Sequence, residues 1–112
     1  MSGNADTAPR LSVVIPTCHR NDLLSICLEH LAPGRQTLEP SNYEVIVTDD
    51  GSTSTAEEMI RDRFGWARWV PGPRRGPAAN RNHGALAAQG EWLVFCDDDC
   101  LPSRGFLEAY KE

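Results

Sequence analysis

The chain has 112 residues, of which 40% are hydrophobic and 24% are charged, and its 11 basic and 16 acidic residues give a formal net charge of −5. This balance predicts one globular domain and excludes low-complexity disorder, collagen and coiled coil. The negative charge argues against nucleic acid as a partner, because non-specific binding to phosphates requires a broad basic face.

No segment is apolar over the ~20 residues that a transmembrane helix needs, and the longest apolar run is Trp92–Cys96. Residues 1–10 are polar and lack the apolar region of a secretory signal. We therefore expect residues 1–10 to be a disordered tail and 11–112 to be the folded domain. The expected location is cytoplasmic, or peripheral at the inner face of the membrane. The four cysteines include no C-x-x-C pair and are expected to be reduced.

Apolar runs rich in β-branched residues alternate with helical patterns along the chain. In chain order, we expect strand 11–16, helix 21–31, strand 43–48, helix 55–64, strand 67–70, helix 77–89, strand 92–96 and the start of a helix after Ser103. A capping box at Thr55 is expected to open the second helix, and Gly90 to end the third. The alternation predicts an α/β fold with an open, mostly parallel sheet built from Rossmann-like βαβ units.

Ligands of open α/β sheets bind beyond the carboxyl ends of the strands. The segments that follow the four expected strands are 17–20, 49–52, 72–75 and 97–99, and all four are rich in polar, charged or glycine residues. We therefore expect the functional site at this edge of the sheet.

Three consecutive aspartates, Asp97, Asp98 and Asp99, directly follow the last expected strand. Neighbouring carboxylates repel by roughly 3 kcal/mol, and a bound cation would remove that repulsion. In extended chain Asp97 and Asp99 would point the same way, so they could share one hard cation, Mg²⁺ or Mn²⁺. The alternative is a solvated acidic turn that caps the next helix.

A second acidic pair, Asp49 and Asp50, precedes Gly51 and Ser52 at the end of another strand. These carboxylates could accept hydrogen bonds from a base N–H or a ribose hydroxyl. The alternative is an ordinary Asp-Gly turn followed by helix-capping residues.

Arginines surround the start of the expected helix 77–89: Arg74, Arg75 and Arg81. The helix dipole is positive at this end, so a cluster of cations there is better explained by a nearby anion such as a nucleotide diphosphate. Arg20 is a candidate for a similar role. The alternative is that these long side chains only extend into solvent.

Taken together, four segments resemble glycosyltransferase family 2, which has the GT-A fold, and they follow the order of that family. They are VVIPT with Arg20, VIVTDDGS, GPAANRNHG and WLVFCDDDCLP, and the resemblance runs from Leu11 to about Leu107. One departure is Asn80, which stands where the family usually has alanine or another small residue.

The resemblance implies a site for the nucleotide part of a sugar donor. Pro16 and Thr17 would border the base pocket, and Asp49 and Asp50 would lie near the nucleoside, with the contacting residue left open. Arg81 would lie beside the nucleotide.

The acidic triplet corresponds to the D-x-D segment of the family. Asp97 and Asp99 would bind the Mg²⁺ or Mn²⁺ that bridges the donor diphosphate, and Asp98 would approach the sugar. The implied donor is a nucleotide-diphosphate sugar, with a UDP-sugar favoured.

The implied reaction is glycosyl transfer with inversion to a hydroxyl of a saccharide or lipid acceptor. The family's general base is a carboxylate in a segment after the D-x-D half, so we expect the base and the acceptor-binding half beyond Glu112, and this chain by itself to be inactive or weakly active. The alternative is a nucleotide- and divalent-metal-binding module without catalysis. A phosphoacceptor receiver domain would require a lysine after one of the later strands. It is disfavoured, because the only lysine is Lys111.

Overall fold

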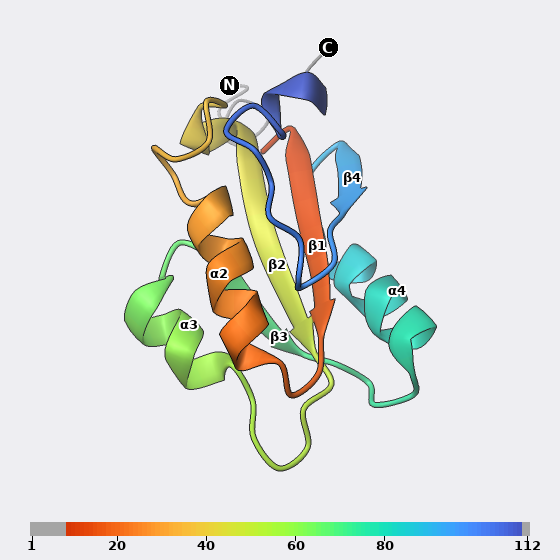
Figure 1. Ribbon diagram of the computed structural model, residues 1–112. Coiled ribbons are helices and arrows are strands. Elements are labelled where there is room, and N and C mark those ends of the chain that lie inside the picture. The colour runs from red at the N-terminus through yellow and green to blue at the C-terminus, as the bar shows by residue number, and fades with distance from the viewer. Residues whose placement is uncertain (1–8, 111–112) are drawn as a thin grey trace.

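A computed structural model describes residues 9–110, in which four parallel strands form one sheet (Figure 1). The strands are β1 (Leu11–Thr17), β2 (Tyr43–Asp49), β3 (Arg68–Pro71) and β4 (Trp92–Phe95). Their order is β3-β2-β1-β4, so the direction of winding reverses at β1. The predicted α/β class and parallel sheet are confirmed, and the reversal places a ligand crevice beside the carboxyl end of β1.

The connections are helices α2 (Asn21–Leu31), α3 (Glu57–Arg63) and α4 (Pro77–Ala87), with short 3₁₀ turns η1 (Pro40–Asn42) and η2 (Glu108–Tyr110). Helices α2 and α3 lie on one face of the sheet, and α4 lies on the other (Figure 1). Within residues 9–110, no helix has the length and apolar character needed to span a membrane.

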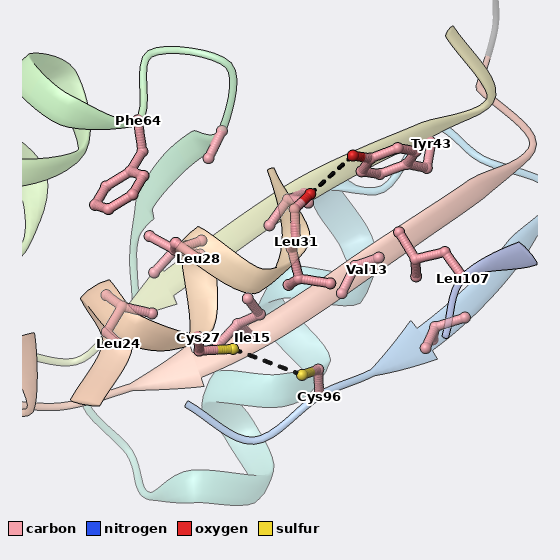
Figure 2. Packing of buried hydrophobic residues seen from close by; sticks show 14 of the residues in the cluster. Val13, Ile15, Leu24, Cys27, Leu28, Leu31, Tyr43, Phe64, Cys96 and Leu107 are labelled. Atoms are coloured by element: carbon pink, nitrogen blue, oxygen red, sulfur yellow. Dashed lines mark hydrogen bonds between the residues drawn. The ribbon is translucent and has the colours of Figure 1, made fainter. Parts of the chain in front are cut away.

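The main core lies between the sheet and helix α2. The apolar positions of α2 recur at helical spacing and are fully buried, namely Leu24, Cys27, Leu28 and Leu31. They pack over Val13 and Ile15 of β1, whose side chains point to the same face because strand residues alternate (Figure 2). Burying each large aliphatic side chain contributes roughly 1.5–3 kcal/mol.

Helix α4 approaches the opposite face of the sheet through a glycine. A Cβ at Gly84 would lie 2.5 Å from Val14 Cγ1 and 2.8 Å from Thr48 Cγ2, both closer than carbon atoms pack. Because residue 84 has no side chain, the helix lies directly against β1 and β2. Its first turn, which starts at Pro77 as predicted, is thereby held near the carboxyl ends of both strands.

Each strand differs from its predicted bounds by one residue at one or both ends, and three predicted helix signals are wrong. Helix α3 is preceded by Ala56 and has no side-chain cap, so Thr55 does not form a capping box. Helix α4 ends at Ala87, before Gly90, whose N–H donates instead to Ser12 Oγ at 2.8 Å. The residues after Ser103 form turns and the short η2 in place of a regular helix.

The expected tail, residues 1–10, lies mostly outside the described residues. Arg10 is described, and its backbone N–H donates to Asn42 O at 2.9 Å, while its carbonyl accepts from Glu91 and Trp92. Among the described residues, backbone hydrogen bonding to the rest of the fold thus includes Arg10, which was expected to belong to the tail.

A buried tyrosine gives the fold a specific alkaline sensitivity. Tyr43 donates its hydroxyl to Leu31 O at 2.7 Å (Figure 2), and burial raises the pKa of Tyr43 from 10.0 to about 12. The neutral phenol is favoured in the folded state, so this stabilisation is complete below pH ~10 and is lost as the pH rises toward 12.

We expect Tyr43→Phe to remove this part of the pH dependence. At pH 8 the variant should be less stable by about 0.5–1.5 kcal/mol, the usual net value of one hydrogen bond. Urea unfolding at a series of pH values between 8 and ~12 checks this. Parallel pH profiles of the two proteins would contradict it.

Candidate functional site

The loops after the four strands meet at one edge of the sheet. Strands β1 and β2 pair in register from Leu11–Tyr43 to Thr17–Asp49, so they end side by side (Figure 1). A hollow of about 490 Å³ lies at these ends, and five of the predicted donor-binding residues line it: Pro16, Thr17, Arg20, Asp50 and Asp98. The structure therefore brings together residues that are up to 82 positions apart in the sequence, since 98 − 16 = 82.

Arg81 and Asp97 line an adjacent hollow of about 330 Å³. Pro16 and Pro77 line both hollows, so the two are contiguous. The guanidinium of Arg81 lies over the ring of Phe95, with its carbon 5.3 Å from the ring centroid. Because Arg74 lines the first hollow and Arg75 lines neither, the predicted arginine cluster is divided between the two hollows and the solvent.

Asp98 ties the loop after β4 to the end of β1. Its carboxylate is only 5% exposed and accepts a hydrogen bond of 2.8 Å from Thr17 Oγ1. Arg20 Nε lies 3.5 Å from the same carboxylate, and Arg20 Nη2 lies 3.3 Å from Asp99. A buried charge is tolerated when it is paired in this way, so Asp98 is held in one position at the floor of the hollow.

The acidic triplet is part of a turn, closed by a hydrogen bond of 3.1 Å from Cys100 N–H to Asp97 O. The expectation of extended chain at this point is therefore wrong. Asp97 and Asp99 are nevertheless both exposed, whereas Asp98 is buried. Carboxylate oxygens are suitable ligands for Mg²⁺ or Mn²⁺, and such ions are commonly held by one or two carboxylates plus substrate phosphates. The donor set fits such an ion, although no three His, Cys, Asp or Glu side chains of residues 9–110 form a metal cluster.

Thiols lie beneath this turn. Cys27 Sγ is 3.8 Å from Cys96 Sγ (Figure 2), and all four cysteines are free thiols. The hydrogen bond with Cys27, together with burial, raises the pKa of the Cys96 thiol, and burial raises the pKa of Cys100. The thiolate is the form that binds metal, so these raised pKa values make Cys96 and Cys100 unfavourable metal ligands.

The two neighbouring aspartates of the second loop have different environments. Asp49 is 2% exposed and accepts three hydrogen bonds, from Gly51 N–H at 2.8 Å, Ala56 N–H at 2.7 Å and Trp69 Nε1–H at 2.9 Å. The hydrogen-bonding capacity of the Asp49 carboxylate is thus used by groups of the protein itself. Asp50 faces the hollow and accepts one hydrogen bond of 2.8 Å, from the backbone N–H of Arg74.

Asn80 is a site residue that was not predicted from the sequence. This side chain is 2% exposed, and its amide donates to Thr17 O at 3.3 Å and to Thr48 O at 3.0 Å. Its own oxygen accepts from Thr48 Oγ1 at 2.7 Å. Asn80 therefore links helix α4 to the ends of β1 and β2, and a polar residue at a position where a small one was expected is the sequence signal for such a link.

The profile of the family described as "Glycosyl transferase family 2" matches residues 12–110. The chain belongs to glycosyltransferase family 2. Validoxylamine A glucosyltransferase from Streptomyces hygroscopicus subsp. limoneus is 39% identical over 97% of this family 2 chain, which covers 24% of that relative. Poly(ribitol-phosphate) beta-glucosyltransferase from Bacillus spizizenii is 34% identical over 90% of the chain, which covers 17% of it. This family 2 chain thus spans about a quarter or less of the length of these relatives.

Solved structures support the same fold. S. aureus TarS 1–349 in complex with UDP superposes with a TM-score of 0.79 at 24% identity, over 91% of this chain and 31% of that one. Mannosyltransferase PcManGT from Pyrobaculum calidifontis, in complex with GDP-Man and Mn²⁺, gives a TM-score of 0.73 at 29% identity, over 87% of this chain and 30% of that one. The predicted family and its GT-A fold are confirmed.

Proposed function

We propose that this family 2 chain is the donor-binding part of an inverting glycosyltransferase. It would hold a nucleotide-diphosphate sugar, with a UDP-sugar favoured, together with Mg²⁺ or Mn²⁺, for transfer to a saccharide or lipid hydroxyl by the whole protein. The observation that carries the proposal is the convergence of Thr17, Asp50 and Asp98 on one hollow at the point where the strand order reverses. The complex of PcManGT with GDP-Man and Mn²⁺ adds support.

The nucleoside contact is proposed for Asp50 rather than for Asp49. Asp50 lines the hollow and accepts a single hydrogen bond, whereas the buried carboxylate of Asp49 already accepts three. Pro16 and Thr17 would border the base, since they lie at the end of β1 on the wall of the same hollow. The role proposed for Asp49 is to shape the loop that presents Asp50.

The diphosphate is proposed to lie toward the second hollow, between Arg81 and the exposed Asp97 and Asp99. These two carboxylates would hold the cation, and Asp98 would face the sugar. When bound, the cation supplies positive charge that stabilises the leaving diphosphate. Arg81, beside the first turn of α4, would add a charge-assisted hydrogen bond to the same group.

Calorimetric titration of UDP and GDP, with and without Mn²⁺, tests the proposal. We expect UDP to bind in the presence of Mn²⁺ and to bind much more weakly without it. If neither nucleotide binds even with metal, the assignment of the donor site is wrong. Binding of nucleotide by this chain, with no hydrolysis of a sugar donor and no transfer from it by the whole protein, would favour the non-catalytic module.

Asp99→Ala is expected to reduce Mn²⁺-dependent nucleotide affinity at least ~10-fold, the scale of one lost charge-assisted contact. The fold should remain intact, because the Asp99 side chain is 53% exposed and Arg20 keeps its second partner, Asp98. Asp62→Ala is the matched control, since Asp62 is an exposed aspartate that also pairs with an arginine. Titration with UDP and Mn²⁺ measures both, and unchanged affinity of Asp99→Ala would refute the metal assignment.

A further inference from the structure

Among residues 9–110, two residues other than glycine have left-handed backbone: His19, with a φ of 55°, and Arg74, with a φ of 59°. Residues with a Cβ avoid this conformation, and it persists only where surrounding contacts impose it. The two residues lie in different loops, after β1 and after β3. Both nevertheless contact the loop after β2, which lies between them.

Their contacts converge on a single peptide bond. His19 Nε2 accepts a hydrogen bond of 3.0 Å from Ser52 N–H, and Arg74 Nη2 donates one of 3.1 Å to Gly51 O. Gly51 O and Ser52 N belong to the same peptide unit, so this unit is held at both ends by side chains from neighbouring loops. A Cβ at Gly51 would overlap the carbonyl of Ser54, which shows how tightly the loop turns there.

This peptide lies at the rim of the hollow. Asp50 and Ser52, on either side of Gly51, both line it, as does Arg74. Arg74 also donates its backbone N–H to Asp50, at 2.8 Å. A rotation of the Gly51–Ser52 peptide would therefore displace the carboxylate to which the nucleoside contact is assigned.

We propose that His19 is a positioning residue of the donor site, which as a neutral hydrogen-bond acceptor fixes the Gly51–Ser52 peptide together with Arg74; this rests on the proposed function. Acceptance by Nε2 requires the ring proton to be on Nδ1, which lies 3.7 Å from Cys18 Sγ. Protonation of the ring places a second N–H at Nε2, which then faces the N–H of Ser52, and the contact is lost.

The charged groups around the imidazole come from several elements. Arg20 and Asp22 share a hollow with His19, and the Cys18 thiol lies 3.7 Å from Nδ1. Arg74 holds the other end of the peptide, and Asp50 lies beside that peptide. Of these side-chain types, only imidazole ordinarily changes its charge between pH 5 and 8. A change of the Ser52 contact in this interval would therefore report on His19.

The first test is hydrogen exchange of the Ser52 amide, measured by NMR on the 112-residue chain without nucleotide. We expect exchange at least ~10-fold faster in His19→Ala than in wild type, and wild-type protection in His19→Gln, because Gln Oε1 is an acceptor that reaches the position of Nε2. His30→Ala is the control, since His30 is a half-buried histidine whose ring hydrogen bond, to Ile26 O at 2.8 Å, lies within helix α2. Equal exchange in wild type and His19→Ala would show that His19 does not fix the Gly51–Ser52 peptide.

The pH dependence provides a test that does not need the alanine variant. Ser52 protection in wild type, corrected for intrinsic exchange, should fall when acid protonates the ring, whereas His19→Gln, which has no ring to protonate, should show no such fall. Identical profiles of the two proteins would refute the role of the neutral ring, even if His19→Ala does not fold.

The second test is titration with UDP and Mn²⁺. We expect about 5- to 10-fold weaker binding for His19→Ala, because it loses one hydrogen-bond acceptor. His19→Gln keeps an acceptor and should bind within about 2-fold of wild type. If wild type binds no nucleotide, the proposed function fails. Exchange of the Ser52 amide still shows whether His19 fixes the Gly51–Ser52 peptide. If exchange follows the expected pattern but His19→Ala binds as tightly as wild type, the positioning role is wrong and the donor site stands.

Discussion

Asp49→Ala is expected to destabilise the protein by about 3 kcal/mol or more, because it leaves three donors without an acceptor. Two of them, the backbone N–H groups of Gly51 and Ala56, are buried with the carboxylate, and the third is the indole N–H of Trp69. A domain of this size has a total stability of about 5–15 kcal/mol, so the loss would be a large part of it. Urea denaturation followed by circular dichroism measures the change.

Asp50→Ala is the matched control, one residue away. Asp50 is half-buried and accepts a single hydrogen bond, so its removal should cost no more than about 1 kcal/mol of stability. The nucleotide affinity of Asp50→Ala should nevertheless fall, whereas the main effect of Asp49→Ala should be a loss of stability. Equal losses of stability in the two variants would show that the division of roles between them is wrong.

The second large effect is expected for Asn80→Leu, a change to an apolar side chain of similar length. The backbone carbonyls of Thr17 and Thr48 would lose their amide donor, and the Thr48 hydroxyl would lose its acceptor, in a place that is 2% exposed. We expect a loss of about 2–4 kcal/mol, from unpaired polar groups and altered packing. Denaturant unfolding measures it.

Asn82→Leu is the control on the same helix, since Asn82 is exposed and the substitution is the same. It should change stability by less than about 0.5 kcal/mol. Asn80→Ala should be milder than Asn80→Leu, because water from the adjoining hollow can replace part of the amide. A stability loss as large in Asn82→Leu as in Asn80→Leu would attribute the effect to helix surface rather than to the link between strands.

The sequence predicts the sheet well because its signal is local. Apolar β-branched runs mark the four strands, and helix α2 was predicted with the bounds that the structure has, Asn21–Leu31. The position of the site follows from topology, since parallel strands bring their carboxyl ends to one edge. Five predicted donor-binding residues meet there for this reason.

The division between Asp49 and Asp50 could not be predicted, because it depends on where a strand ends. Strand β2 was expected to end at Thr48 but continues through Asp49. Asp49 therefore follows the alternation of the strand and points to the same face as Val47, toward α3 and Trp69. The predicted strand ended at Thr48, so it did not determine to which face the Asp49 side chain points.

The error at the start of α3 has a related cause. A local motif suggested that Thr55 caps the helix, but the N–H of Ala56 donates to Asp49, seven positions earlier in the chain. A strand residue thus supplies an acceptor at the start of this helix that the local motif does not include. Asn80 is a similar case, since its partners lie 32 and 63 positions away and nothing in the local pattern identifies them.

The close approach at Gly84 has a consequence for how this protein can change. One turn separates Gly84 from Asn80 and Arg81, so a side chain that lifts α4 from the sheet would move a wall of both hollows. On the α4 side, selection for a durable fold and selection for ligand affinity act on the same few residues.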